Sequence, residues 1–184
     1  MLELDTPTAD REDLLADSDD VSFSLAKVQG RQRRIEASIG LPFTVEQVWT
    51  VLTDYETLSE FIPNLAASCR LPHPEGGIRI EQIGVQNLKV MTFKARVVLD
   101  MIEDFPSAIR FNMVEGDFKA FSGAWLLEPI SSPQGDGTKL SYVLEVWPKA
   151  TIPVIAIEQR LKKDLPQNLR AIRDRLSQSL HLCP

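Results

Sequence analysis

Hydrophobic and polar side chains alternate through the middle of the chain. Between residues 91 and 101 every second position is apolar, and the positions between them carry side chains such as Lys94 and Asp100. The same period of two returns at residues 109–113, 121–127 and 140–146. Such alternation is typical of antiparallel strands that bury one face and expose the other to water. We therefore predict that residues 71–147 form consecutive strands with no helix between them.

A different period marks the C-terminal part of the chain. From residue 153 to residue 180 the apolar side chains recur every three or four positions, which places them in one stripe along a helix. A helix of this length is roughly 40 Å long. Pro153 suits its first turn, and Pro166 inside it predicts a kink. The opposite face is predominantly basic and comprises Arg160, Lys162, Lys163, Arg170, Arg173 and Arg175 with Glu158, Asp164 and Asp174.

The N-terminal pattern predicts one long strand and two short helices. Residues 21–39 alternate on both sides of Gly30, which indicates a strand with a bulge or kink at that glycine. Thr44 begins a capping-box pattern that opens the first helix. Trp49 shares the apolar face of this helix and is predicted to be buried, so that its replacement by alanine should cost about 3–5 kcal/mol. Asp54 is expected to cap the second helix, which Pro63 ends.

These elements together predict an α+β fold. We expect a curved antiparallel sheet of about seven strands wrapped around the long C-terminal helix, with the two short helices between strands 1 and 2. Because a helix is only about 10 Å wide, it cannot fill a broad, twisted sheet that curls around it, and a cavity is expected. Alternating apolar residues are also ordinary core, but the aromatic and methionine content here suits an adaptable ligand-binding wall. The predicted cavity wall comprises Phe93, Val97, Phe111, Met113, Phe121, Trp125, Tyr142, Ile157, Leu161 and Leu165.

Charge is distributed unevenly along the 184 residues. Residues 1–20 contain eight acids and one arginine, a net charge of −7, and the whole chain carries −6, which leaves +1 for the remainder. An acidic segment without aromatic residues is typical of disorder. We therefore predict an acidic disordered tail at residues 1–20 and a single ligand-binding domain at residues 21–182. The body has no basic surplus that would suggest a nucleic-acid partner.

Three absences in the sequence predict a cytoplasmic protein. The two cysteines, Cys69 and Cys183, do not form a disulfide-rich pattern. The N-terminus lacks the apolar region of a signal peptide. No stretch approaches the roughly 18 consecutive apolar residues of a membrane-spanning helix.

Residues able to catalyse a reaction are scarce. His73 and His181 have no metal-ligand partner at a suitable spacing, so no metal is expected. No phosphate-binding or dinucleotide motif is present, so no cofactor is expected. Glu115 shares the period of Phe111 and is the single candidate for an inward carboxyl that acts as an acid with a raised pKa. The alternative is a solvated residue at the end of a strand.

Three segments of the chain carry a family resemblance. They are residues 48–56 (VWTVLTDYE) with residues 61–64 (FIPN), residues 118–125 (FKAFSGAW) and residues 164–169 (DLPQNL). In these segments the chain resembles the START-like superfamily, and within it the polyketide cyclase/dehydrase and coenzyme-Q-binding branch. The resemblance covers roughly residues 31–178. It implies the helix-grip fold and a deep apolar cavity for lipids, quinones or aromatic polyketides, but no single activity.

Three functions are compatible with these features. The first is the binding or transport of a hydrophobic small molecule (a quinone, isoprenoid, lipid or polyketide-like compound) without catalysis, with the basic helix face in transient contact with a membrane surface. The second is a polyketide aromatase/cyclase or dehydratase, for which Glu115, Tyr142 and Arg96 are the polar candidates, although Arg96 is out of phase with the apolar face. The third is a protein-interaction module that uses residues 58–63 or the acidic tail.

Overall fold

The computed structural model describes residues 21–88, 91–132 and 135–180, with side chains placed at all of these except residues 86–88, 91–93, 132 and 180. The predicted acidic tail therefore lies outside the described residues. The elements follow one another as β1 (Ser22–Lys27), β2 (Arg33–Leu41), α1 (Val45–Thr53), α2 (Leu58–Phe61), β3 (Leu65–Leu71), β4 (Ile78–Leu88), β5 (Met91–Asp104), β6 (Ala108–Gly116), β7 (Phe118–Ser132), β8 (Gly135–Pro148) and α3 (Val154–Leu180).

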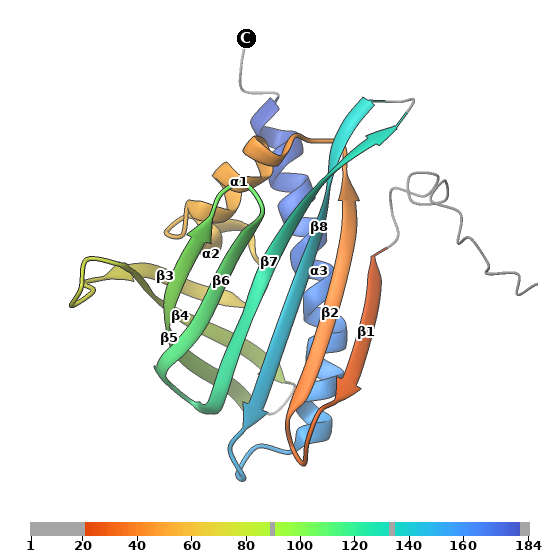
Figure 1. The fold of residues 1–184 in the computed structure, drawn as a ribbon. Helices are drawn as coiled ribbons and strands as arrows, with labels where there is room; N and C mark the ends of the chain where they lie inside the picture. The colour runs from red at the N-terminus through yellow and green to blue at the C-terminus, as the bar shows by residue number, and fades with distance from the viewer. Residues whose placement is uncertain (1–20, 89–90, 133–134, 181–184) are drawn as a thin grey trace, which may run out of the picture.

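One antiparallel sheet and one long helix dominate this fold. The eight strands lie in the order β1-β2-β8-β7-β6-β5-β4-β3. Helix α3 contacts β1, β2 and β8, and Figure 1 shows it running along these strands behind the sheet. The two edge strands, β1 and β3, point in clearly different directions in Figure 1, as the twist of a broad sheet requires. The predicted α+β fold, a curved sheet around a long C-terminal helix, is confirmed.

The structure corrects the interpretation of Gly30. Gly30 adopts a φ of 51° in the turn that joins β1 to β2, rather than making a bulge within one strand. The amide of Gln32 donates to the carbonyl of Gln29 at 2.8 Å, which closes the turn. The two halves then pair with each other, with Ser22 opposite Ser38. This hairpin raises the strand count to eight and places the short helices between β2 and β3.

The start of α1 follows its capping sequence. Thr44 Oγ1 accepts from the Gln47 amide at 3.4 Å, and the Thr44 amide donates to Gln47 Oε1 at 2.9 Å, so the predicted capping box is confirmed. Asp54 was expected to cap α2, but it lies at the C-terminal end of α1 and α2 begins after Thr57. The Asp54 carbonyl instead accepts from the Thr57 amide at 3.1 Å.

The hydrophobic core lies between α3 and the sheet. Helix α3 remains one element across Pro166, and a kink at that proline stays a prediction. Its apolar stripe, which includes Leu169 and Ile172, is buried against the inward residues of the strands and α1, among them Ile35, Val48 and Leu144. Trp49 was expected to be buried on the same face of α1, but it is only partly buried and packs at the margin of the core.

Candidate functional site

A cavity of about 220 Å³ lies between α3 and the sheet. The strands contribute inward side chains from β3 to β8, and the segment between α1 and β3 covers the side near Leu58 and Ile62. Pro63 and Asn64 are exposed residues that also line the cavity, so it reaches the surface at the α2–β3 connection. The expected space between sheet and helix is therefore present.

Aromatic side chains build one wall of this cavity. The rings of Trp125 and Tyr142 stack with their centroids 3.9 Å apart and an interplanar angle of 9°. This pair forms because the two residues lie opposite each other on β7 and β8. The ring of Phe111 lies 5.8 Å from that of Phe121 and 6.0 Å from that of Tyr142. Because π-faces and edges attract, such a wall suits a planar ligand.

Two tyrosines of the lining remain neutral phenols. Burial raises the pKa of Tyr142, because the phenolate would lose its hydration in the apolar wall. Burial also raises the pKa of Tyr55, and the carboxylate of Glu103 adds to the effect by accepting a hydrogen bond from its hydroxyl at 2.7 Å. Both tyrosines can therefore donate a hydrogen bond at neutral pH.

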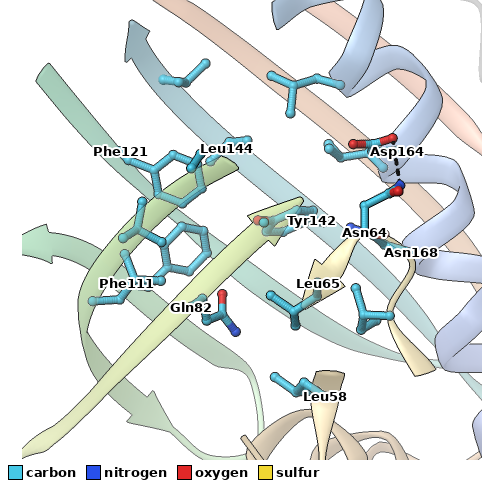
Figure 2. A pocket seen from close by; sticks show the side chains of 18 of the residues that line it. Leu58, Asn64, Leu65, Gln82, Phe111, Phe121, Tyr142, Leu144, Asp164 and Asn168 are labelled. Carbon is cyan, nitrogen blue, oxygen red and sulfur yellow. Dashed lines mark hydrogen bonds between the residues drawn. The ribbon is translucent and has the colours of Figure 1, made fainter. Parts of the chain in front are cut away.

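A row of polar side chains on α3 lines the cavity opposite this wall. Arg160, Asp164 and Asn168 are spaced one turn apart, and we call them the polar row. Arg160 Nε donates to Asp164 Oδ2 at 3.0 Å, and Asn64 Nδ2 donates to Asp164 Oδ1 at 3.3 Å. Figure 2 shows Asn64, Asp164 and Asn168 on one side of the cavity and Phe111 and Phe121 on the other.

Burial governs the chemistry of the polar row. Desolvation raises the pKa of Asp164, and the charge of Arg160 only partly offsets this rise. Oδ1 of Asn168 is buried and, within the part of the chain that the structure describes, accepts no hydrogen bond. Asn64 is held by its backbone, because its φ of 62° turns the chain and its carbonyl accepts from the Val85 amide at 2.8 Å. Asparagine tolerates that left-handed conformation better than most residues.

Most of the predicted wall residues lie around the cavity. The lining includes Val97, Phe111, Phe121, Trp125, Tyr142, Ile157, Leu161 and Leu165. Met113 is not part of the lining and packs against the core as a partly buried residue. The side chain of Phe93 lies outside the described residues.

The structure does not place Glu115 in the cavity. Its side chain is 70% exposed and accepts from Arg96 Nη1 at 2.6 Å. The register of β5 and β6 shifts by one residue, because Val98 pairs with Glu115 while Leu99 pairs with Met113. This bulge inverts the alternation after Met113 and turns Glu115 to the outer face, where Arg96 also lies. The inward carboxyl predicted at Glu115 is therefore wrong.

The histidines give no metal site in the described residues. His73 Nε2 lies 3.4 Å from Asp100 Oδ2, in a cluster with Arg79 on the outer side of β4 and β5. No group of three or more potential ligands capable of holding a metal ion occurs in the described ranges. His181 lies outside them.

Sequence reasoning missed the polar row. Arg160 and Asp164 were assigned to the solvent-facing side of the long helix, and Asn168 was used only as part of the family motif at residues 164–169. The sequence does contain a signal: these residues each follow an apolar stripe residue (Ile157, Leu161 and Leu165) by three positions. Residues three apart are neighbours on a helix surface. Polar side chains that repeat at this spacing lie along one flank of the apolar stripe, and in this structure that flank faces the cavity.

The long helix held against one antiparallel sheet defines a helix-grip fold. Residues 41–173 match the profile of a family described as polyketide cyclase/dehydrase and lipid transport, and the chain belongs to this family. Among curated proteins no significant sequence match was found. Across the described residues, no helix is both long and apolar enough to cross a membrane.

Solved structures with the same fold have diverse descriptions. A STAR-related lipid transfer protein from Xanthomonas axonopodis is 18% identical, with a TM-score of 0.70 and coverage of 88% of this chain and 96% of that chain. The Zhui aromatase/cyclase from Streptomyces sp. R1128 is 13% identical, with a TM-score of 0.65 and coverage of 81% and 96%. Human STARD10 is 10% identical, with a TM-score of 0.64 and coverage of 86% and 74%. At these identities the likeness concerns the fold alone.

Proposed function

We propose that this protein binds a hydrophobic small molecule in the cavity and carries it without chemical change. The observation that carries the proposal is the apolar cavity with its flat platform of stacked Trp125 and Tyr142. Burial of apolar surface at about 25 cal/mol per Å² supplies the binding energy. The stacked rings add selectivity for planar groups.

The size of the cavity narrows the class of ligand. Pockets for drug-sized molecules measure about 300–1,000 Å³, and the cavity measures about 220 Å³. It therefore fits a compound of one or two rings or a short single chain, such as the ring of a quinone or a short isoprenoid. A lipid with two long acyl chains requires more space than this.

The proposal is tested by ligand capture. The purified full chain is denatured and extracted, and mass spectrometry identifies any apolar compound that is released. Nile red, an uncharged environment-sensitive dye, is then titrated into the stripped protein and displaced by short-chain ubiquinone or geraniol. We expect saturable dye binding and displacement by at least one of these compounds. Extraction without any apolar compound, together with no saturable dye binding, would contradict the proposal.

One observation supports a second function, the cyclisation or dehydration of a poly-ketone. Tyr142 and Asp164 both line the cavity, and burial raises the pKa of each. A carboxyl with a raised pKa is a suitable proton donor for such reactions, and a neutral phenol can hydrogen-bond to a ketone oxygen. The test is incubation with a poly-β-ketone thioester, followed by mass spectrometry for loss of water. Activity that disappears in Asp164→Asn supports this function, and its absence in the wild-type protein rejects it.

A further inference from the structure

The cavity has two chemically different ends. Stacked and tilted aromatic rings from β6, β7 and β8 form one end, and the polar row of α3 with Asn64 forms the other. In Figure 2, Phe111 and Phe121 lie on one side of the cavity and Asp164 and Asn168 lie on the other. The polar groups are largely removed from water: the side chains of Arg160 and Asp164 are 17% and 12% exposed. Polar groups placed in an apolar cavity cost free energy unless a partner satisfies them.

We propose, building on the ligand-binding function above, that the polar row holds the head group of the ligand and selects an uncharged polar head, such as a hydroxyl or a carbonyl. Asp164 is the residue that excludes carboxylates. The ligand is then a small planar amphiphile: its ring lies against the wall near Trp125 and Tyr142, and its polar atom points to α3.

The paired charges of the polar row disfavour ionised ligands. Arg160 and Asp164 are bonded to each other, so together they present no net charge to the cavity. A ligand carboxylate would lose its hydration in the cavity without meeting a net positive charge, and the negative charge of Asp164 would repel it. A ligand ammonium would meet the guanidinium of Arg160 in the same way. An uncharged head group avoids both costs.

The buried amide of Asn168 disfavours a purely apolar ligand. Its Oδ1 is buried and, among the described residues, has no hydrogen-bond partner. Native proteins rarely leave such a group unpaired without a reason. An amide has both an acceptor and a donor, so it can satisfy a hydroxyl or a carbonyl. A hydrocarbon would leave the buried Oδ1 of Asn168 without a hydrogen-bond partner.

A matched set of naphthalenes tests the selectivity. The compounds are 2-naphthol, 2-methylnaphthalene and 2-naphthoate, which share the ring and differ only in the head group. Each competes with Nile red on the wild-type full chain at neutral pH. We expect naphthol to bind about threefold to tenfold more tightly than methylnaphthalene, which is the gain from one net hydrogen bond. Naphthoate should bind the most weakly. Equal affinities for all three compounds would overturn the inference, whereas no binding of any of them, with no Nile red binding either, would overturn the proposed function itself.

Two variants assign the selectivity to named residues. Asp164→Asn removes the negative charge that repels a ligand carboxylate, so naphthoate affinity should rise at least about tenfold. Asp174→Asn is the matched control, since Asp174 lies on the same helix with its side chain 63% exposed and bonded to Arg173. This control should leave naphthoate binding unchanged. If both variants, or neither, change naphthoate affinity, Asp164 is not the selective residue.

Asn168→Leu provides an independent measurement. It replaces the amide by an apolar group of similar size. We expect naphthol affinity to fall about threefold to tenfold, to the level of methylnaphthalene, with methylnaphthalene affinity unchanged. The unfolding midpoint without ligand should stay the same or rise, because a buried unpaired acceptor is removed. An equal loss of affinity for both compounds would show that Asn168 only shapes the cavity, and the head-group assignment would fail.

Discussion

The ring of Phe111 on β6 lies over Gly123 on β7, directly across the strand pair. A Cβ added at residue 123 would lie 2.6 Å from Phe111 Cζ and would also collide with the carbonyl oxygen of Val143. The missing side chain of Gly123 therefore gives Phe111 its place in the aromatic wall. Neighbouring rings depend on this placement, because Phe111 contacts both Phe121 and Tyr142.

Gly123→Ala is expected to destabilise the protein and disturb the cavity. The new methyl group must displace either the ring or the β8 backbone, and overpacking of this kind costs about 1–3 kcal/mol. Urea unfolding measures the loss. Gly84→Ala is the matched control, because its nearest neighbours would be at 3.8 Å, an ordinary contact distance. Equal stability of the two variants would contradict the close approach of Phe111.

Trp49 illustrates a prediction that the structure changes. The sequence suggested a fully buried residue whose removal would cost about 3–5 kcal/mol. In the structure the indole is partly buried and makes an edge-to-face contact with Phe105, with ring centroids 5.1 Å apart. Phe105 is itself 60% exposed in the β5–β6 turn. We therefore expect Trp49→Ala to cost less, about 2 kcal/mol, because part of its surface already faces water.

A double-mutant cycle isolates the contact between these rings. The coupling free energy between Trp49→Ala and Phe105→Ala should be about 0.5–1.5 kcal/mol, the usual value for an aromatic pair. Urea unfolding of the wild type, both single variants and the double variant provides it. Strict additivity would mean that the two rings do not interact in solution.

Period and phase determine how much of this site could be predicted from the sequence. The alternation in β5 correctly predicted that Val97, Leu99 and Met101 face the cavity and core, because a strand without a bulge keeps its phase. The same reasoning failed at Glu115, since the single-residue bulge beyond Met113 inverts the phase and leaves no clear trace in the pattern. Alternation predicts which face a residue occupies only up to the next bulge.

The long helix α3 shows a second limit of prediction from the sequence. The apolar stripe of α3 was correct, but a stripe locates the centre of a buried face and not its edges. Arg160 and Asp164 lie at that edge, and the cavity widens the buried face enough to enclose them. In a solid core they would have reached water. The sequence alone therefore does not distinguish polar residues that line a cavity from polar surface residues, because the distinction depends on how far the sheet curls around the helix.

Two aspartates should respond to pH in opposite directions. Burial raises the pKa of Asp164 above its ordinary value of 3.8, so the folded state binds that proton more tightly than the unfolded state does. Its contribution to stability is present at low pH and is lost as the pH rises through the raised value. The hydrogen bond from Arg79 lowers the pKa of Asp100, so its contribution is present above 3.8 and is lost as the pH falls.

Urea unfolding between about pH 4 and pH 7 measures this contrast. The free energy of unfolding of Asp164→Asn, relative to the wild type, should increase as the pH rises through this range. That of Asp100→Asn should decrease, with most of its change at the acidic end. Parallel slopes for the two variants would contradict the opposite environments of these carboxyl groups.

The cavity itself is tested by filling it from the sheet side. Val97 on β5 is 7% exposed and lines the cavity opposite the first half of α3, so a larger side chain at this position has space in front of it. Val97→Phe should abolish Nile red binding and leave the free energy of unfolding roughly unchanged. If the space were instead a solid core, the extra atoms would cost about 1–3 kcal/mol. Val28→Phe is the control, because Val28 is 52% exposed in the β1–β2 turn and should affect neither quantity. A Val97→Phe protein that unfolds easily while its folded fraction binds the dye normally would show that no usable cavity exists beside β5, because a ring placed in the ligand's space must exclude the ligand.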